Sequence, residues 1–160
     1  LWQHADDPWV DSVLFFMYTG FRINETLSVR KSDVNLTDQT VKGGSKSAAG
    51  KNRIIPIHPK IKHIVEKRYA SSKHYLFEID NNTLSTGAYF SRWSQIMDEL
   101  SLSHVVHECR HTLRSEMDTK GANKVCIDMI MGHKSQGVGE RVYTHKTIQD
   151  LRESLLLVDY

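Results

Sequence analysis

One break in an otherwise helical pattern is the feature that most constrains the fold of this chain. Apolar residues recur at helical spacing along most of it, as at Val10, Val13 and Met17. Residues 38–57 differ, because two strand-like runs, at 40–42 and 52–57, are joined by the Gly- and Ser-rich stretch 43–50. The pattern predicts a mainly α-helical (α+β) domain with a small antiparallel β-sheet near its first third.

The same spacing predicts where the helices lie. They are expected over residues 8–18, about 24–29, from 59 onward, and over about 86–100, 107–120, 124–131 and 147–158. Gly20, Gly121 and Gly132 follow three of these segments, at the position where glycine commonly ends a helix. A turn is expected around Asn81 and Asn82.

Length and composition favour one soluble globular domain. The chain has 160 residues, 39% of them hydrophobic and 25% charged, which is enough to bury a core. No apolar run approaches the roughly 20 residues needed to span a bilayer, and no signal peptide is visible, so we expect no membrane partner. Cys109 and Cys126 are too few for a disulfide framework, which favours reduced thiols in a cytoplasmic protein. The first residue is not Met, so we expect a piece of a longer protein. The net charge of +2 permits a nucleic-acid partner without indicating one.

Four local patterns occur in a fixed order along the chain. The first is Thr-Gly-Phe-Arg-Ile-Asn-Glu-Thr-Leu at residues 19–27, and the second is a hairpin lysine ahead of Asn-Arg-Ile-Ile-Pro-Ile at 52–57. The third is His-Glu-Cys-Arg-His-Thr at 107–112. The fourth is Met-Gly-His at 131–133, followed ten residues after His133 by Tyr143. Each is weak alone, but all four in this order and spacing are highly specific.

Together these patterns resemble the tyrosine recombinase (phage integrase) family over nearly the whole chain. The resemblance implies the single catalytic domain, residues 1–160, of a site-specific DNA recombinase that works through a 3′-phosphotyrosyl intermediate. Nothing in the chain corresponds to the N-terminal core-binding domain of family members. The catalytic set that the resemblance implies is Arg22, Lys46, His107, Arg110, His133 and Tyr143, with Glu25 as a supporting acid.

The implied residue types also suit the chemistry of phosphodiester cleavage. Attack on phosphorus develops negative charge on the non-bridging oxygens, and the planar forks of Arg22 and Arg110 match two phosphate oxygens. The phenol of Tyr143 has to lose its proton to attack, and His107 titrates in the range of a general base. In a helix, His107 and Arg110 lie three residues apart on one face. His133 would hydrogen-bond a phosphate oxygen.

The catalytic lysine and the nucleophile each have rivals. Lys46 is expected to protonate the departing 5′ oxygen, although Lys42 and Lys51 lie in or beside the same loop. Lys46 is preferred because Gly-Ser-Lys ahead of the second strand best resembles the family hairpin. Tyr143 follows the Gly-His pair by ten residues where the family usually has nine, and we expect residues 137–139 to absorb the extra one.

Other interpretations of single residues stay open at this point. Arg22 and Glu25 alone would suit a surface ion pair at i and i+3. His104, His107 and His111 have spacings that invite a metal interpretation, but only the last two form an i, i+4 pair and no cysteine pair accompanies them. No phosphate-binding Gly-rich loop and no two-metal carboxylate cluster is present, so we expect neither a metal nor a cofactor.

The resemblance also implies partners and leaves alternatives. It implies double-stranded DNA, a homo-tetramer on DNA that is monomeric or weakly associated without it, and accessory DNA-bending proteins, in a bacterial or phage-infected cell. Integration or excision of a phage or other mobile element is the expected role. The alternatives are type IB topoisomerase-like relaxation and a non-catalytic DNA-binding remnant. The helix over 147–158 either packs on its own core or docks on a neighbouring protomer.

Overall fold

Helices make up most of the chain, as its apolar spacing predicted. A computed structural model describes residues 1–7, 9–44, 50–133 and 146–160. The helices are α1 (Val10–Thr19), α2 (Ile23–Leu27), α3 (Pro59–Ser71), α4 (Thr86–Glu99), α5 (Val106–Thr119), α6 (Lys124–Met131) and α8 (Ile148–Leu156), with short 3-10 turns η1 (Trp2–His4) and η2 (Lys31–Asp33). The strands are β1 (Val34–Asn35), β2 (Thr40–Gly43), β3 (Arg53–Pro56), β4 (Glu78–Ile79) and β5 (Asn82–Thr83).

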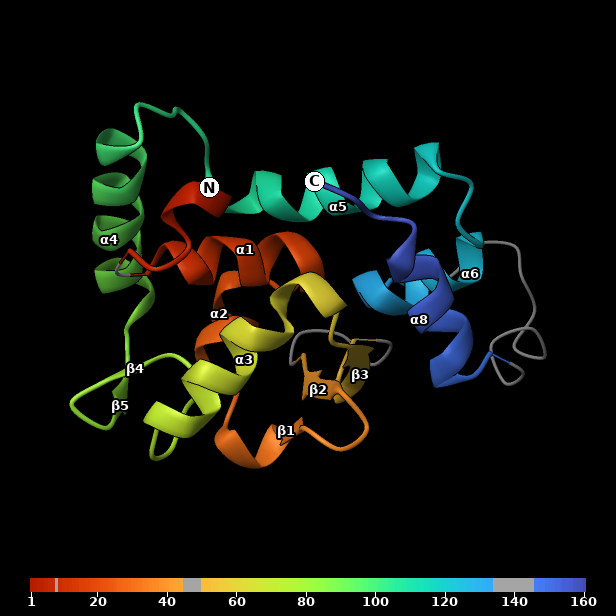
Figure 1. Ribbon diagram of the computed structural model, residues 1–160, viewed down its shortest axis with the longest axis horizontal. Coiled ribbons are helices and arrows are strands. Elements are labelled where there is room, and N and C mark those ends of the chain that lie inside the picture. The colour runs from red at the N-terminus through yellow and green to blue at the C-terminus, as the bar shows by residue number, and fades with distance from the viewer. Residues whose placement is uncertain (8, 45–49, 134–145) are drawn as a thin grey trace.

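Helix α1 forms the centre of the core. It packs against α5 on one side and α3 on the other, and Figure 1 shows α1 and α5 running side by side. Nine of its ten residues are buried, including Phe15 and Phe16, because apolar side chains surround nearly the whole helix. Trp2 donates a hydrogen bond to the carbonyl oxygen of Tyr160, so residues near the two ends of the described chain lie together.

The main sheet has one strand more than the expected hairpin. Its order is β1-β2-β3, all antiparallel, and Val41 pairs with Val34 on one side and Ile55 on the other. The added strand has only two residues, which is too short for a period-two pattern to reveal it. A second, two-stranded sheet, β4-β5, encloses the turn expected near Asn81, where Asp80 and Asn81 both have positive φ.

Helices α6 and α8 cover the end of the sheet. The helix α8 packs on α6 and β3, and Figure 1 shows it beside α6 at the opposite end of the molecule from α4. Leu151 and Leu155 are buried there, as is Val158 just beyond the helix, so this apolar stripe covers the core of its own chain. Ile148, in the first turn of the helix, is 40% exposed.

Glycines end the helices on which the site is built. Gly20 after α1 and Gly132 after α6 both adopt the left-handed conformation, with φ of 62° and 63°. Each therefore turns the chain sharply, and the residues that follow project into one region between α5 and the sheet. Both stops agree with the expectation from sequence.

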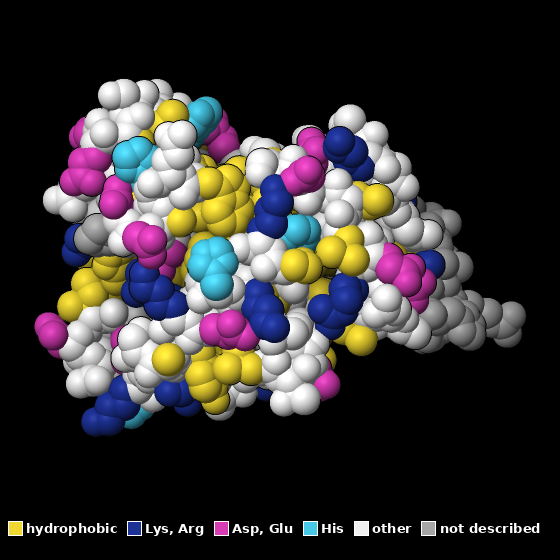
Figure 2. Space-filling model, in the orientation of Figure 1, with side chains coloured by type: hydrophobic (Ala, Val, Ile, Leu, Met, Phe, Trp, Pro, Cys, Tyr) yellow, Lys and Arg dark blue, Asp and Glu magenta, His cyan; other side chains and the backbone are white. Residues whose placement is uncertain are grey.

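The surface has mixed charge. On the face shown in Figure 2, the Lys and Arg side chains of the described residues are interspersed with Asp and Glu rather than gathered into one basic area. Within the described ranges, no helix is long and apolar enough to cross a membrane.

Candidate active site

The first element of the site is the tight turn between α1 and α2. Gly20 ends α1, and Arg22 caps the start of α2 two residues later. The backbone N–H of Arg22 donates to one carboxylate oxygen of Glu25 at 2.9 Å, and its Nη1 donates to the other at 3.1 Å. The expected i, i+3 ion pair is therefore present, and it holds the Arg22 side chain, which stays 29% exposed, at the edge of the site.

A buried ion pair ties this turn to the sheet. Arg53 on β3 donates from Nη1 and Nη2 to the two oxygens of Glu25, at 3.1 Å and 2.8 Å. It also donates from Nε to the carbonyl of Ile130 at the end of α6, and from Nη1 to the carbonyl of Gly50. Burial alone raises the pKa of Glu25, but the hydrogen bonds from Arg53 and Arg22, together with their charges, outweigh burial and leave this pKa lowered.

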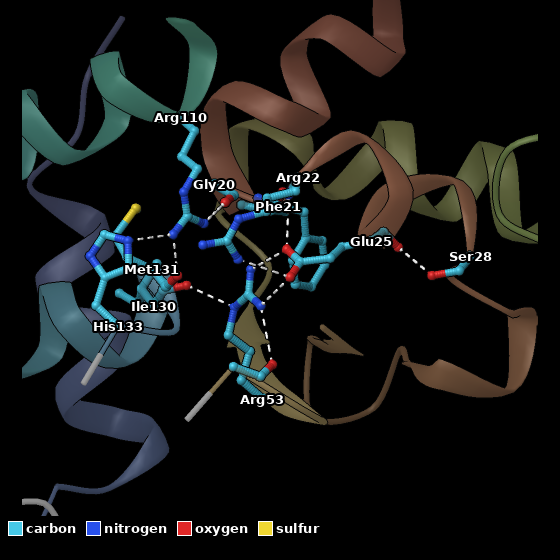
Figure 3. A network of polar contacts seen from close by, with 12 residues as sticks. Gly20, Phe21, Arg22, Glu25, Ser28, Arg53, Arg110, Ile130, Met131 and His133 are labelled. Atoms are coloured by element: carbon cyan, nitrogen blue, oxygen red, sulfur yellow. Dashed lines mark hydrogen bonds and ion pairs between the residues drawn. The ribbon is translucent and has the colours of Figure 1, made fainter. Parts of the chain in front are cut away.

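Arg110 is held from two sides by backbone oxygens. Its Nη1 donates to the carbonyl of Gly20, and its Nη2 donates to the carbonyl of Met131 (Figure 3). The residue is only 5% exposed. Burial, with the charges of Arg22 and Arg53, lowers the pKa of Arg110 to about 10, so the guanidinium stays charged at neutral pH. Two helix ends thus fix one guanidinium on α5.

His133 follows Gly132 and lies against two arginines of α5. Its Nε2 is 3.0 Å from Nη2 of Arg110, and its Nδ1 is 3.4 Å from Nη1 of Arg114. Burial lowers the pKa of His133, as do the charges of Arg110, Arg114 and Arg22, while Asp128 opposes them. The imidazole is therefore mainly neutral at pH 7.

His107 lies in the first turn of α5, one turn before Arg110. Partial burial lowers its pKa, followed by the charges of His111, Arg110 and Arg22. Its ring makes an edge contact with His111, with the centroids 4.6 Å apart. A cleft of about 460 Å³ connects His107 with the start of α2, and its lining consists of residues 21–25, Phe90 and residues 105–107. His107 and Arg22 therefore border the same open space.

The structure brings together four of the six residues proposed as catalytic, along with Glu25. Arg22, Arg110 and His133 belong to one network around Glu25 and Arg53 (Figure 3), and His107 adjoins it through the cleft. Lys46 and Tyr143 lie outside the described residues. Of the rival lysines, Lys51 is exposed, and Lys42 pairs with Asp33 at 3.3 Å.

Two further arginines belong to this site although the sequence analysis did not single them out. Arg53 has a detectable signal, since period-two alternation in its strand places it on the same face as the buried Ile55. Arg114 stands four residues after Arg110, and so on the same helical face. Its neighbour His133, however, comes from a different helix end, which local spacing does not reveal.

The described residues form neither a metal-binding cluster nor a reactive-thiol site. No three His, Cys, Asp or Glu side chains among the described residues are arranged to hold a metal ion. His104, one of the three histidines considered as ligands, instead contacts the carboxylate of Glu108 at 2.9 Å. Cys109 is buried, and burial raises the pKa of its thiol to about 12, so it acts as a small apolar side chain.

Comparison with known proteins relates the chain to curated recombinases. Tyrosine recombinase XerA of Saccharolobus solfataricus is 26% identical over 140 residues, which cover 86% of this chain and 46% of that protein. Tyrosine recombinase XerC of Staphylococcus saprophyticus is 26% identical over 155 residues, covering 90% and 51%. The chain thus spans about half the length of the curated relatives it matches.

The fold and the family agree with these similarities. The integrase from mycobacterium phage Brujita has a similar fold, with a TM-score of 0.73 at 16% identity over 93% of this chain and 50% of that one. The XerA recombinase crystal structure gives 0.67 at 21% identity over 94% and 58%. The sequence model of the phage integrase family matches residues 7–150, nearly the whole chain. The chain therefore belongs to the phage integrase family, which confirms the resemblance seen in its motifs.

Proposed function

We propose that this chain is the catalytic domain of a site-specific DNA recombinase, which cleaves and rejoins DNA strands through a covalent bond to Tyr143. One observation carries the proposal: four side chains from three separate segments lie together, with Arg22 and His107 lining one cleft and Arg110 and His133 in contact beside it. Such a cationic cluster suits a phosphodiester whose non-bridging oxygens gain charge as it reacts.

The two arginines play different parts in binding the phosphate. Arg110 uses Nη1 and Nη2 for its contacts with Gly20, Met131 and His133, so its orientation is fixed before DNA binds. Its Nε makes no hydrogen bond to the described residues, and an arginine carries five N–H donors in all. Arg22 is tied to Glu25 and is more exposed, so it approaches the phosphate from the solvent side. A fixed and a more exposed guanidinium together orient one phosphate.

Cleavage exchanges one phosphate ester for another. The Tyr143 oxygen bonds to phosphorus, the bond from phosphorus to the 5′ oxygen breaks, and the phenol proton passes to neutral His107. Lys46 returns a proton to the departing 5′ oxygen. The lowered pKa of His107 favours the neutral form, which a base requires at pH 7. Because the phosphotyrosyl ester keeps the energy of the original bond, the reversal joins strands without a nucleotide cofactor.

The wider role of the protein follows from the same family. The substrate is double-stranded DNA, and the protein works as a homo-tetramer on DNA to integrate or excise a phage or another mobile element. A fold similar to the Tn1549 transposon integrase, whose structure is a complex with circular intermediate DNA, supports this role, as does the likeness to the phage Brujita integrase. The TM-score to the transposon protein is 0.69 at 17% identity, over 92% of this chain and 57% of that one.

A trapped covalent complex tests the proposed reaction. The protein, expressed from its intact gene, is mixed in EDTA with nicked duplexes of randomised sequence, because loss of a short fragment at the nick prevents rejoining. A protein–DNA band that resists denaturation is expected from the wild type and from Tyr75→Phe, the matched control. Tyr143→Phe should abolish it. A band that persists in Tyr143→Phe would refute this nucleophile.

The same substrates separate the remaining alternatives. Lys46→Ala should abolish the band and Lys51→Ala should preserve it, whereas the opposite result would reassign the catalytic lysine. Relaxation of a supercoiled plasmid without strand exchange between two sites would instead favour the topoisomerase-like activity. DNA binding with no covalent band on any sequence in the pool would indicate a non-catalytic remnant.

A further inference from the structure

Large apolar side chains stand exposed in the same cleft as Arg22 and His107. Phe90 on α4 is 50% exposed, and Val105, just before α5, is 61% exposed. Both line the cleft of about 460 Å³, together with the partly buried Ile23. Ligand sites in proteins commonly combine an apolar lining with a few polar groups that orient the ligand. The cleft therefore has the character of a binding site beyond its two basic residues.

The start of α4 holds Phe90 in place before any ligand arrives. The hydroxyl of Ser85 caps this helix by accepting from the backbone N–H of Ala88. Thr86 donates from its hydroxyl to Oδ1 of Asn24 at 2.6 Å, and this contact ties the start of α4 to α2. Phe90 lies four residues after Thr86 and hence on the same helical face, so its ring borders the cleft on the side of α2. A wall that is fixed in advance lowers the entropic cost of binding.

The charged residues of the cleft determine which class of ligand fits it. Arg22, whose side chain is 29% exposed, lines the cleft, and so does His107. Glu25 also belongs to the lining, but its carboxylate is already bound by Arg22 and Arg53. A suitable ligand therefore carries an anionic group with an apolar group close to it. DNA meets both requirements, because each phosphate is joined through its sugar to a base.

Paired DNA offers one apolar group where a helix can reach it. The major groove admits an α-helix, and the 5-methyl group of thymine is the apolar group displayed there. Phenylalanine is among the side chains that suit a contact with this methyl. The other base edges present hydrogen-bond donors and acceptors, for which the side chains of Phe90 and Val105 carry no polar partner atoms.

We propose that Phe90 and Val105 form an apolar contact with the 5-methyl group of a thymine, and so help to select the DNA sequence beside the phosphate that Arg22 binds. The inference rests on the proposed function, because that function supplies the ligand. Since Arg22 and Phe90 line one cleft, the thymine lies close along the duplex to the phosphate at Arg22. Phe90 is thus a specificity residue in addition to the implied catalytic set.

Removal of single thymine methyl groups tests the contact directly. A duplex that binds the wild-type protein, expressed from its intact gene, is first selected from a randomised pool. Each thymine is then replaced in turn by deoxyuridine, which lacks only the methyl, and the Kd is measured. Burial of a group of this size contributes about fourfold to affinity, so one thymine should show a loss of roughly that size. In Phe90→Ala the same replacement should change the Kd little, because the methyl has lost its partner.

Two further variants separate this contact from general effects of the substitution. Leu156 on α8 has the same exposed fraction as Phe90, 50%, and α8 lies at the opposite end of the molecule from α4 (Figure 1). Leu156→Ala should therefore keep the full effect of deoxyuridine. Phe90→Leu should keep most of it, because leucine still presents an apolar surface to the methyl.

The possible results distinguish this contact from the proposed cleavage. A selected duplex in which no thymine methyl contributes, or a deoxyuridine effect that is equal in the wild type and Phe90→Ala, would overturn the contact. Altered self-association of Phe90→Ala in sedimentation, with unchanged methyl dependence, would assign these side chains to a protein interface instead. Duplex binding does not require the phenol of Tyr143, so a methyl effect without a covalent band would refute the cleavage and leave this contact standing. Failure to bind any duplex would overturn both.

Discussion

The carboxylate of Glu25 is the point at which a single substitution should do most damage to the site. It accepts hydrogen bonds from the backbone N–H of Arg22, from Nη1 of Arg22 and from both terminal nitrogens of Arg53. In Glu25→Gln the shape is preserved, but one oxygen acceptor is replaced by an NH₂ group that faces guanidinium donors. Arg53 then keeps its charge in a buried place without an anion.

The burial of the pair sets the size of the effect. The side chains of Arg53 and Glu25 are 5% and 1% exposed. Removing one partner of a buried ion pair costs about 3–5 kcal/mol, because the other charge stays desolvated and uncompensated. For a chain of this size 1 kcal/mol lowers Tm by about 2–4 °C, so Glu25→Gln should lower Tm by about 6–20 °C.

Urea unfolding followed by circular dichroism measures this loss directly. The matched control is Glu66→Gln, which removes a carboxylate from an exposed pair with Lys62 and should cost at most about 1 kcal/mol. In the double variant Glu25→Gln/Arg53→Met no buried charge is left unpaired, so its cost should be well below the sum of the two single variants. Additive single effects, or a loss below about 1 kcal/mol for Glu25→Gln, would refute the reasoning.

The carboxylate of Glu25 also makes the stability of the fold depend on pH. Although burial raises the pKa of Glu25, hydrogen bonds and charges from Arg53 and Arg22 lower it overall, below its model-compound value of 4.5. A group with a lowered folded pKa contributes stability above its unfolded pKa and loses it as the pH falls through the folded value. The difference in unfolding free energy between wild type and Glu25→Gln should therefore shrink below about pH 4.5.

Two further predictions concern a close approach and a buried imidazole. A Cβ on Gly132, where φ is +63°, would stand 2.8 Å from Gly50 Cα, whereas Gly121 has a φ of +76° but open space around it. Gly132→Ala should therefore lower the free energy of unfolding by about 1–3 kcal/mol more than Gly121→Ala. Equal losses in urea unfolding would contradict this. Burial, with the charge of Lys60, lowers the pKa of His58 to about 4, so stability should be lost as the pH falls from about 6.5 to 4, by up to roughly 3 kcal/mol. His58→Asn keeps a helix-capping acceptor but cannot titrate, and it should flatten that part of the stability profile.

Local rules predicted the elements that carry the site. Helical spacing located every α-helix of the described chain to within a few residues, and the glycine stops at Gly20 and Gly132 were correct because only local backbone geometry decides them. The strand β1 was missed for the opposite reason. Its two residues pair with β2 through Val34 and Val41, so it exists through its partner and not through a pattern of its own.

The contacts inside the site were harder to foresee than its members. The motifs pointed to Arg22, Arg110 and His133, but they could not show that Arg110 reaches the carbonyl of Gly20, 90 positions away in the chain. Such contacts depend on how α1, α5 and α6 pack. Arg53 illustrates an intermediate case, because strand alternation predicts that it points inward, while its partner Glu25 follows only from the fold.

The way each arginine is held suggests how a cluster of like charges remains folded before a substrate arrives. Arg53 is neutralised by Glu25 and stays inside, where it joins β3 to the end of α6 and has no need of a ligand. Arg110 instead donates hydrogen bonds to backbone carbonyls, which orient it without cancelling its charge. Arg22 and Arg114 are more exposed, so water screens them. The positive charge that no buried carboxylate neutralises therefore lies beside the cleft and on α5. An incoming phosphate would be the strongest counterion available there.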